Sequence, residues 1–321
     1  MSSWETQLGP PWRAHLAVWA LLVFAAGAMT PLADPDLPLH LAIGEWIVQH
    51  RGLPVQEPFS WTRAGAPFYA YSWFMAVLYY WVYSVWGPLG LRVFFGLTLV
   101  SSAAAVLMLA RAAGWRPWTA LFLAMVNVVV LSFVVAALRP QVVLAIAVPL
   151  AWASAYRLMD AEKIRWPVAG LVLSSALAAN SHLLFPLTAS SWILLFTRIP
   201  RAKERRRVVA MIGGVVLGWL LSPYVLQWPE MFRLNFASNA LQAPFSPISE
   251  MRPGFLLSFQ NAAASLVALG FTLLPWSLAS ARLNRRERVA FAASWLIGLL
   301  LFSFAARALL VWWLLVIPVV A

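Results

Sequence analysis

Long apolar stretches recur along the whole chain, and most of them are long enough to cross a bilayer. The first runs from His15 to Ala33 and exceeds the apolar core of a signal peptide, so we interpret it as a retained helix. Hydrophobic residues make up 62% of the sequence and charged residues 11%, far fewer charges than a soluble domain carries. The pattern predicts an all-α fold, a polytopic transmembrane helical bundle that forms a single domain over residues 1–321. We expect about ten spans, at 15–33, 93–110, 118–137, 141–157, 166–181, 183–197, 208–226, 256–280, 289–305 and from 308 onward.

The lysines and arginines decide how one ambiguous stretch is interpreted. Residues 69–87 either cross the membrane or lie along its surface, where their many tryptophans and tyrosines suit the headgroup region. Without a crossing here, sixteen basic residues fall on the cytoplasmic side and seven on the other. With a crossing, the split becomes six inside against seventeen outside, which inverts the positive-inside rule. We therefore predict that 69–87 does not cross and that 34–92 is one long extracytoplasmic loop with membrane-parallel helices.

An acidic segment, DPDLPLHLAIGEW, follows the first span and holds three of the eleven acidic residues of the chain. Asp34 before Pro35 predicts a helix start with Asp34 as the N-cap. Asp36 would then lie one position inside the helix, on the same face as His40. Glu45 follows nine residues after Asp36 and should face elsewhere. Since carboxylates at a membrane boundary are functional candidates, Asp36 or Asp34 is a candidate general base.

Two other interpretations of this segment stay open. The Asp34 carboxylate could serve only to cap the first helical turn. An Asp-x-Asp pair with a histidine nearby could instead bind a divalent cation such as Mg²⁺ or Mn²⁺, with Asp34 and Asp36 as ligands.

Three cationic or near-cationic residues stand among apolar residues at predicted outer ends of spans: Arg139, His182 and Arg307. A single arginine of this kind usually extends to the interface without further function. Three of them opposite an acidic segment also fit a site for an anionic group such as a phosphate. Glu250 and Arg252, in the later loop SPISEMRPGF, are on the same predicted side.

Several classes of function are excluded or disfavoured. The chain has no cysteine, which excludes disulfides and thiol chemistry. Its net charge of +12 reflects basic loops between spans rather than a nucleic-acid surface. The sequence contains no P-loop, Rossmann glycine pattern, zinc spacing or nucleophile elbow. It also shows no pair of related halves of the transporter type.

Short motifs along nearly the whole chain together resemble bacterial proteins of the GT-C glycosyltransferase superfamily. They are DPDLPLHLAIGEWI, PFSWT, a helix with SW, RPQ, NSH, SPY and SEMRP. The superfamily includes protein O-mannosyltransferases, the aminoarabinose transferase that acts on lipid A, and oligosaccharyltransferases. The resemblance implies sugar transfer from a polyprenyl-phosphate carrier at the outer face of the bacterial inner membrane. It also implies an aspartate of the first loop close to the acceptor, a position that matches Asp34 or Asp36.

The chain departs from this family in two respects. No clear second acidic pair follows in a later loop, where only Glu250 near Arg252 is found. The sequence also ends inside an apolar run, VWWLLVIPVVA, so we expect that the C-terminal part of the family is missing.

The sequence thus predicts a membrane glycosyltransferase that moves a sugar from a polyprenyl-phosphate-linked donor to a lipid, glycan or protein acceptor. Asp36 or Asp34 would act as the base, and Arg139, His182 and Arg307 would neutralise the phosphate. The other candidate substrate-binding residues are His40, Glu45, Glu250 and Arg252. The alternative is a non-enzymatic lipid or polysaccharide transporter, or an assembly subunit of the cell envelope. A transporter should place its ionisable residues at mid-membrane, which this sequence does not do.

Overall fold

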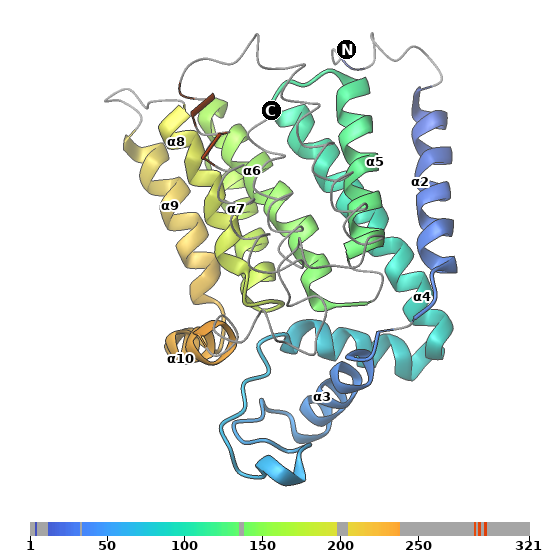
Figure 1. Ribbon diagram of the computed structural model, residues 1–321. Coiled ribbons are helices and arrows are strands. Elements are labelled where there is room, and N and C mark those ends of the chain that lie inside the picture. The colour runs from blue at the N-terminus through green and yellow to red at the C-terminus, as the bar shows by residue number, and fades with distance from the viewer. Residues whose placement is uncertain are drawn as a thin grey trace.

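A computed structural model describes residues 4, 12–32, 34–134, 138–197, 205–237, 286, 288–289 and 292–293 (Figure 1). This part of the chain is helical and has no strand, and only Gln56 and Pro67 form an isolated bridge. The helices are α2 (Trp12–Met29), α3 (Leu37–His50), η1 (Trp61–Arg63), α4 (Trp73–Ala112), α5 (Pro117–Val134), η2 (Pro140–Val143), α6 (Leu144–Asp160), α7 (Arg165–Ala179), η3 (Phe185–Trp192), α8 (Ile193–Thr197), α9 (Arg205–Leu220), η5 (Val225–Gln227), α10 (Trp228–Phe232) and η6 (Arg233–Ala237). The expected all-α class is therefore confirmed for the described residues.

Three of the described helical segments are long and apolar enough to cross a membrane: α2, α4 and the stretch Pro140–Asp160. A fourth is obtained if α9 and Val225–Asn235, which meet at 95°, count as one bent span. Shorter apolar helices cover Pro117–Ser132, Arg165–Ala179 and Phe185–Thr197. These lengths and compositions are those of a helical membrane protein.

The predicted number of about ten spans stays a prediction. The expected spans 256–280 and from 308 onward lie outside the described residues, and only residues 289, 292 and 293 of the span 289–305 are described.

The long helices pack side by side, and α2, the long part of α4, α5, α6 and α7 alternate in direction, whereas α9 runs parallel to α7 after η3 and α8 return the chain (Figure 1). The connections from α4 to α5 and from α6 to α7, which carry basic residues, lie at one end of this bundle. The helix α3 and the loop that follows it lie at the other end, which we call the α3 end. The predicted charge distribution likewise puts the basic connections and the acidic segment around α3 on opposite sides of the protein.

The helix α4 contains a sharp corner at Gly87. This glycine has φ +59° and ψ −153°, a conformation that other residues rarely adopt, and Pro88 begins the next helical turn. Residues 73–86 run across the α3 end of the bundle, whereas residues 88–112 run along it with the other long helices (Figure 1). This direction is the one expected for a segment 69–87 that does not cross the membrane.

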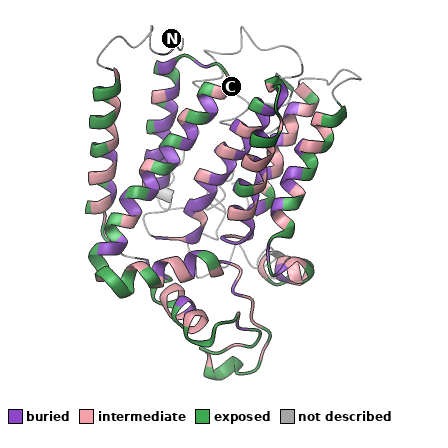
Figure 2. Ribbon diagram, turned by 180° about the vertical axis from the view of Figure 1, so that it is seen from behind, coloured by how far each residue is buried: buried purple, intermediate pink, exposed green. Residues whose placement is uncertain are grey.

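The core of the bundle is built around α6, whose residues are buried on nearly all sides (Figure 2). It packs chiefly against α4 and α7, and α7 in turn packs against α9. Small residues permit close approach between these helices: a Cβ at Gly218 would lie 2.5 Å from the Val172 carbonyl oxygen, and one at Gly96 would lie 2.6 Å from that of Phe24. Such contacts are typical of membrane helices, where association depends on packing rather than on the hydrophobic effect.

Two predicted spans differ from the structure. The span expected over 208–226 ends at Leu220, because the residues Ser222-Pro223 that follow turn the chain into the crosswise η5 and α10. The span expected over 183–197 is a 3₁₀-helix up to Trp192 and becomes α-helical only at Ile193.

Candidate functional site

The start of α3 differs from the prediction in a way that matters for the two aspartates. The helix begins at Leu37 with Asp36 as its N-cap, so Asp34 is not the cap and Asp36 is not inside the helix. The reason lies in the turn before the helix, where the Asp34 carboxylate oxygen Oδ1 accepts the Asp36 N–H at 3.0 Å. This bond and the bond from the Leu37 N–H to the Asp34 carbonyl oxygen close the turn ahead of α3.

A buried ion pair joins this turn to the segment between α5 and α6. Arg139 Nε donates to Asp34 Oδ2 at 3.3 Å, and Arg139 Nη2 lies 3.8 Å from Asp36 Oδ2. The Asp34 side chain is completely buried and that of Arg139 is 20% exposed, whereas that of Asp36 is 58% exposed. One arginine therefore holds two carboxylates, of which only Asp36 is accessible from outside.

His40 lies one turn beyond Asp36 and belongs to the same cluster. Its main-chain N–H donates to the Asp36 carbonyl oxygen at 3.1 Å. Burial lowers the pKa of His40 below its ordinary value, and the Arg139 charge acts in the same direction, while Asp34 and Asp36 partly oppose the shift. The buried His40 Nδ1 has no hydrogen-bond partner among the described residues. Burial therefore disfavours the charged form of this imidazole.

Tyr79, on the crosswise part of α4, completes this cluster and was missed by the sequence analysis. Its ring meets that of His40 edge to face, with centroids 6.4 Å apart, and its side chain is fully buried. The Tyr79 hydroxyl has no partner within the described part of the chain. In the sequence Tyr79 is one of several aromatic residues expected at the membrane surface, and only its neighbours Trp81, Tyr83 and Trp86 are exposed as expected.

Other predicted site residues lie apart from the cluster or outside the described residues. Glu45 is exposed and accepts a hydrogen bond from Gln49 at 3.0 Å, so it faces elsewhere as predicted. His182, in the turn after α7, lies against the ring of Tyr71, and its Nδ1 accepts the Leu184 N–H at 3.1 Å. The candidates Glu250, Arg252 and Arg307 lie outside the described residues.

The predicted convergence of Arg139, His182 and Arg307 in one cavity stays a prediction. The start of α6 and the end of α7 lie at the α3 end of the bundle, so Arg139 and His182 share that end (Figure 1).

The suggested metal site has two carboxylates and a competing cation. Asp34 and Asp36 each place one oxygen within 4 Å of the Arg139 guanidinium, which already supplies positive charge between them. Within the described residues no group of three or more His, Cys, Asp or Glu side chains is arranged to hold a metal ion. A divalent cation at Asp34 and Asp36 thus stays a hypothesis that substitution can test.

Comparison of the chain with protein families, curated proteins and solved structures finds no match.

Proposed function

We propose that this protein is a membrane glycosyltransferase that uses a polyprenyl-phosphate-linked sugar as donor. The proposal places its active face at the α3 end of the bundle, outside the bacterial inner membrane, in keeping with the basic loops at the opposite end. The observation that carries it is the cluster at the start of α3, where the buried Asp34 and the partly buried Arg139 hold the accessible carboxylate of Asp36. A carboxylate held by a buried ion pair at a membrane boundary is an arrangement suited to chemistry.

The two aspartates differ in burial, and this assigns them different roles. Asp36 is the better general base because its carboxylate is more than half exposed and can reach an acceptor hydroxyl. In the proposed reaction, Asp36 removes the proton from that hydroxyl as the oxygen attacks the anomeric carbon of the sugar, and the bond to the polyprenyl phosphate breaks. Asp34 positions Asp36 through the turn and through Arg139.

In the proposed reaction, the positive charge of Arg139 acts on two groups, the Asp36 carboxylate and the leaving phosphate. Arg139 Nη2 lies 3.8 Å from Asp36 Oδ2, which holds the guanidinium beside the carboxylate that acts as base. The same guanidinium favours negative charge that develops on the leaving phosphate.

A transfer assay on purified protein with a lipid-linked sugar tests this assignment. Asp36→Asn should leave folding intact and lower the transfer rate by about 10²- to 10⁴-fold, the usual contribution of a general base. Glu45→Gln is the matched control, because Glu45 is a carboxylate of the same helix that faces away from the cluster. Full activity of Asp36→Asn would refute the role of Asp36 as base.

The same assay separates the proposed reaction from its alternatives. Restoration of the Asp36→Asn or Asp34→Asn variant by added Mg²⁺ or Mn²⁺ would show that the carboxylates hold a cation rather than act as described. Absence of any transfer with all polyprenyl-phosphate sugars, together with lipid movement in vesicles, would favour the transporter interpretation instead.

A further inference from the structure

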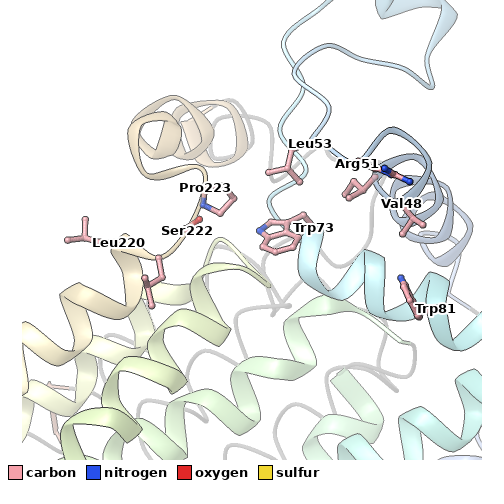
Figure 3. A pocket seen from close by; sticks show the side chains of 11 residues that line it. Val48, Arg51, Leu53, Trp73, Trp81, Leu220, Ser222 and Pro223 are labelled. Atoms are coloured by element: carbon pink, nitrogen blue, oxygen red, sulfur yellow. The ribbon is translucent and has the colours of Figure 1, made fainter. Parts of the chain in front are cut away.

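An apolar groove of about 640 Å³ lies at the α3 end of the bundle, away from the aspartates. Three elements form it: the end of α3, the crosswise part of α4, and the turn that follows α9 (Figure 3). Its walls include Val48 and Arg51 from the end of α3, Trp73 and Trp81 from α4, and Leu220 and Pro223 around the end of α9. Arg51 is the one charged residue among those that line it.

The groove lies at the boundary between the long helices of the bundle and its crosswise elements. Leu220 is the last residue of α9, and Trp73 is the first residue of the crosswise part of α4. Trp81 and Leu221 are 58% and 56% exposed, which leaves apolar surface uncovered at this level. Tryptophan at such a boundary is typical of contact with lipid headgroups and the first part of the acyl chains.

Arg51 adds a fixed positive charge at one side of this apolar surface. It follows α3 directly, with a left-handed backbone conformation of φ +52°, and its side chain is exposed. No acidic side chain forms an ion pair with Arg51 within the described part of the chain. An arginine at the edge of an apolar groove can bind phosphate through its guanidinium while its aliphatic part packs against the groove.

The groove is separate from the proposed reaction site. Asp36 and Arg51 flank the two ends of α3, whose fourteen residues span about 21 Å at the usual helical rise. A phosphate bound at Arg51 is therefore too far from Asp36 to be the phosphate of a reacting donor.

We propose that this groove binds an anionic phospholipid of the surrounding bilayer. One acyl chain packs along Trp81, Val48 and Leu220, and the phosphate contacts Arg51. This inference does not depend on the proposed sugar transfer. A membrane phospholipid is favoured over a polyprenyl phosphate donor because the cation of the groove lies far from the carboxylates.

Native mass spectrometry of the full chain, released from detergent with added lipid, tests the site. The probes are phosphatidylglycerol and phosphatidylcholine with the same acyl chains, together with polyprenyl phosphate. The variants are Arg51→Gln, which removes the charge, and Leu221→Trp, which fills the groove. Arg63→Gln is the matched control, since Arg63 is an exposed arginine of the loop after α3 that does not line the groove.

We expect the unaltered chain to retain phosphatidylglycerol more tightly than phosphatidylcholine. Arg51→Gln should weaken retention of phosphatidylglycerol about fivefold, the usual effect of one basic residue near an anionic membrane. Leu221→Trp should weaken retention of both lipids, and Arg63→Gln should change neither. Equal retention of the two phospholipids by the unaltered chain, or equal losses in Arg51→Gln and Arg63→Gln, would overturn the proposal. A loss in Arg51→Gln that is confined to polyprenyl phosphate would overturn it too.

Discussion

Removal of Asp34 alone from its ion pair with Arg139 should be strongly destabilising, because the Asp34 side chain is fully buried and its loss leaves the largely covered guanidinium without its nearest counter-charge. Asp34→Asn keeps an oxygen that can accept the Asp36 N–H, so the turn before α3 can still form. The substitution removes the charge that compensates the Arg139 guanidinium, of which only 20% of the side chain is exposed. Removal of one partner of a buried ion pair usually lowers the free energy of unfolding by about 3–5 kcal/mol.

We expect a value near the lower end of this range, about 3 kcal/mol, because Asp36 stays close to Arg139 and retains part of the compensation. The double variant Asp34→Asn with Arg139→Gln removes both charges of this pair and leaves only the half-exposed Asp36 carboxylate without its contact to Arg139. The decrease in the free energy of unfolding of the double variant should therefore be smaller than the sum of the decreases of the two single variants. The difference should be about 1–3 kcal/mol, the range for residues in direct contact.

Denaturant unfolding in detergent, followed by the fluorescence of the 19 tryptophans, gives the four free energies of this cycle. Glu230→Gln is the control, because the Glu230–Arg233 pair has a shorter contact of 2.6 Å but is exposed, and its loss should not shift the unfolding midpoint. A loss below about 1 kcal/mol in Asp34→Asn would refute the reasoning, since it would mean that the buried arginine does not need Asp34. Strict additivity in the double variant would refute it as well.

Three further substitutions test other features of this end of the bundle. Gly44→Ala should lower the free energy of unfolding by about 1–3 kcal/mol, since its Cβ would lie 2.1 Å from the Ala76 carbonyl oxygen; Gly213→Ala, which meets nothing within 4 Å, is the control in the same unfolding assay. Tyr79→Phe should leave stability unchanged or raise it by up to about 1 kcal/mol, because the buried hydroxyl that it removes has no partner among the described residues; a clear loss of stability would reveal a partner. His40→Gln should reduce the dependence of stability on pH below about 6.5, the ordinary pKa of histidine. Burial lowers the pKa of His40 in the folded state, so the unfolded chain binds more protons there and the native protein loses stability as the pH falls; an unchanged pH profile in unfolding measurements on the variant would contradict this.

The sequence predicted the features that depend on local composition. Apolar length identified most of the long helices. The charge-based prediction that 69–87 does not cross the membrane stays a prediction, although Gly87 turns residues 73–86 across the end of the bundle (Figure 1). The failures involve turns and contacts that apolar length does not reveal, such as the turn at Ser222-Pro223 that ends α9. Asp34 was expected to cap the helix, as its position before Pro35 suggests, but Arg139, 105 residues away, pairs with its carboxylate and the helix starts at Leu37.

The site could be predicted only in part for the same reason. Asp34, Asp36, His40 and Arg139 are uncommon residues in an apolar sequence, so they could be selected without knowledge of the fold. Tyr79 is one aromatic residue among many in 69–87, and no local signal shows that it faces inward while Trp81 faces outward.

The corner in α4 joins the proposed reaction site to the thickness of the bilayer. Residues 73–86 form a rigid arm about 20 Å long at the usual helical rise, and this arm carries Tyr79 at its middle and Trp73 at its far end. Gly87 is the one non-helical residue within α4, and the proline after it has a fixed φ, so few torsions separate the arm from the span 88–112. A span tilts to match a thinner membrane. A rotation of 10° transmitted through this corner would displace the end of the arm by roughly 3–4 Å.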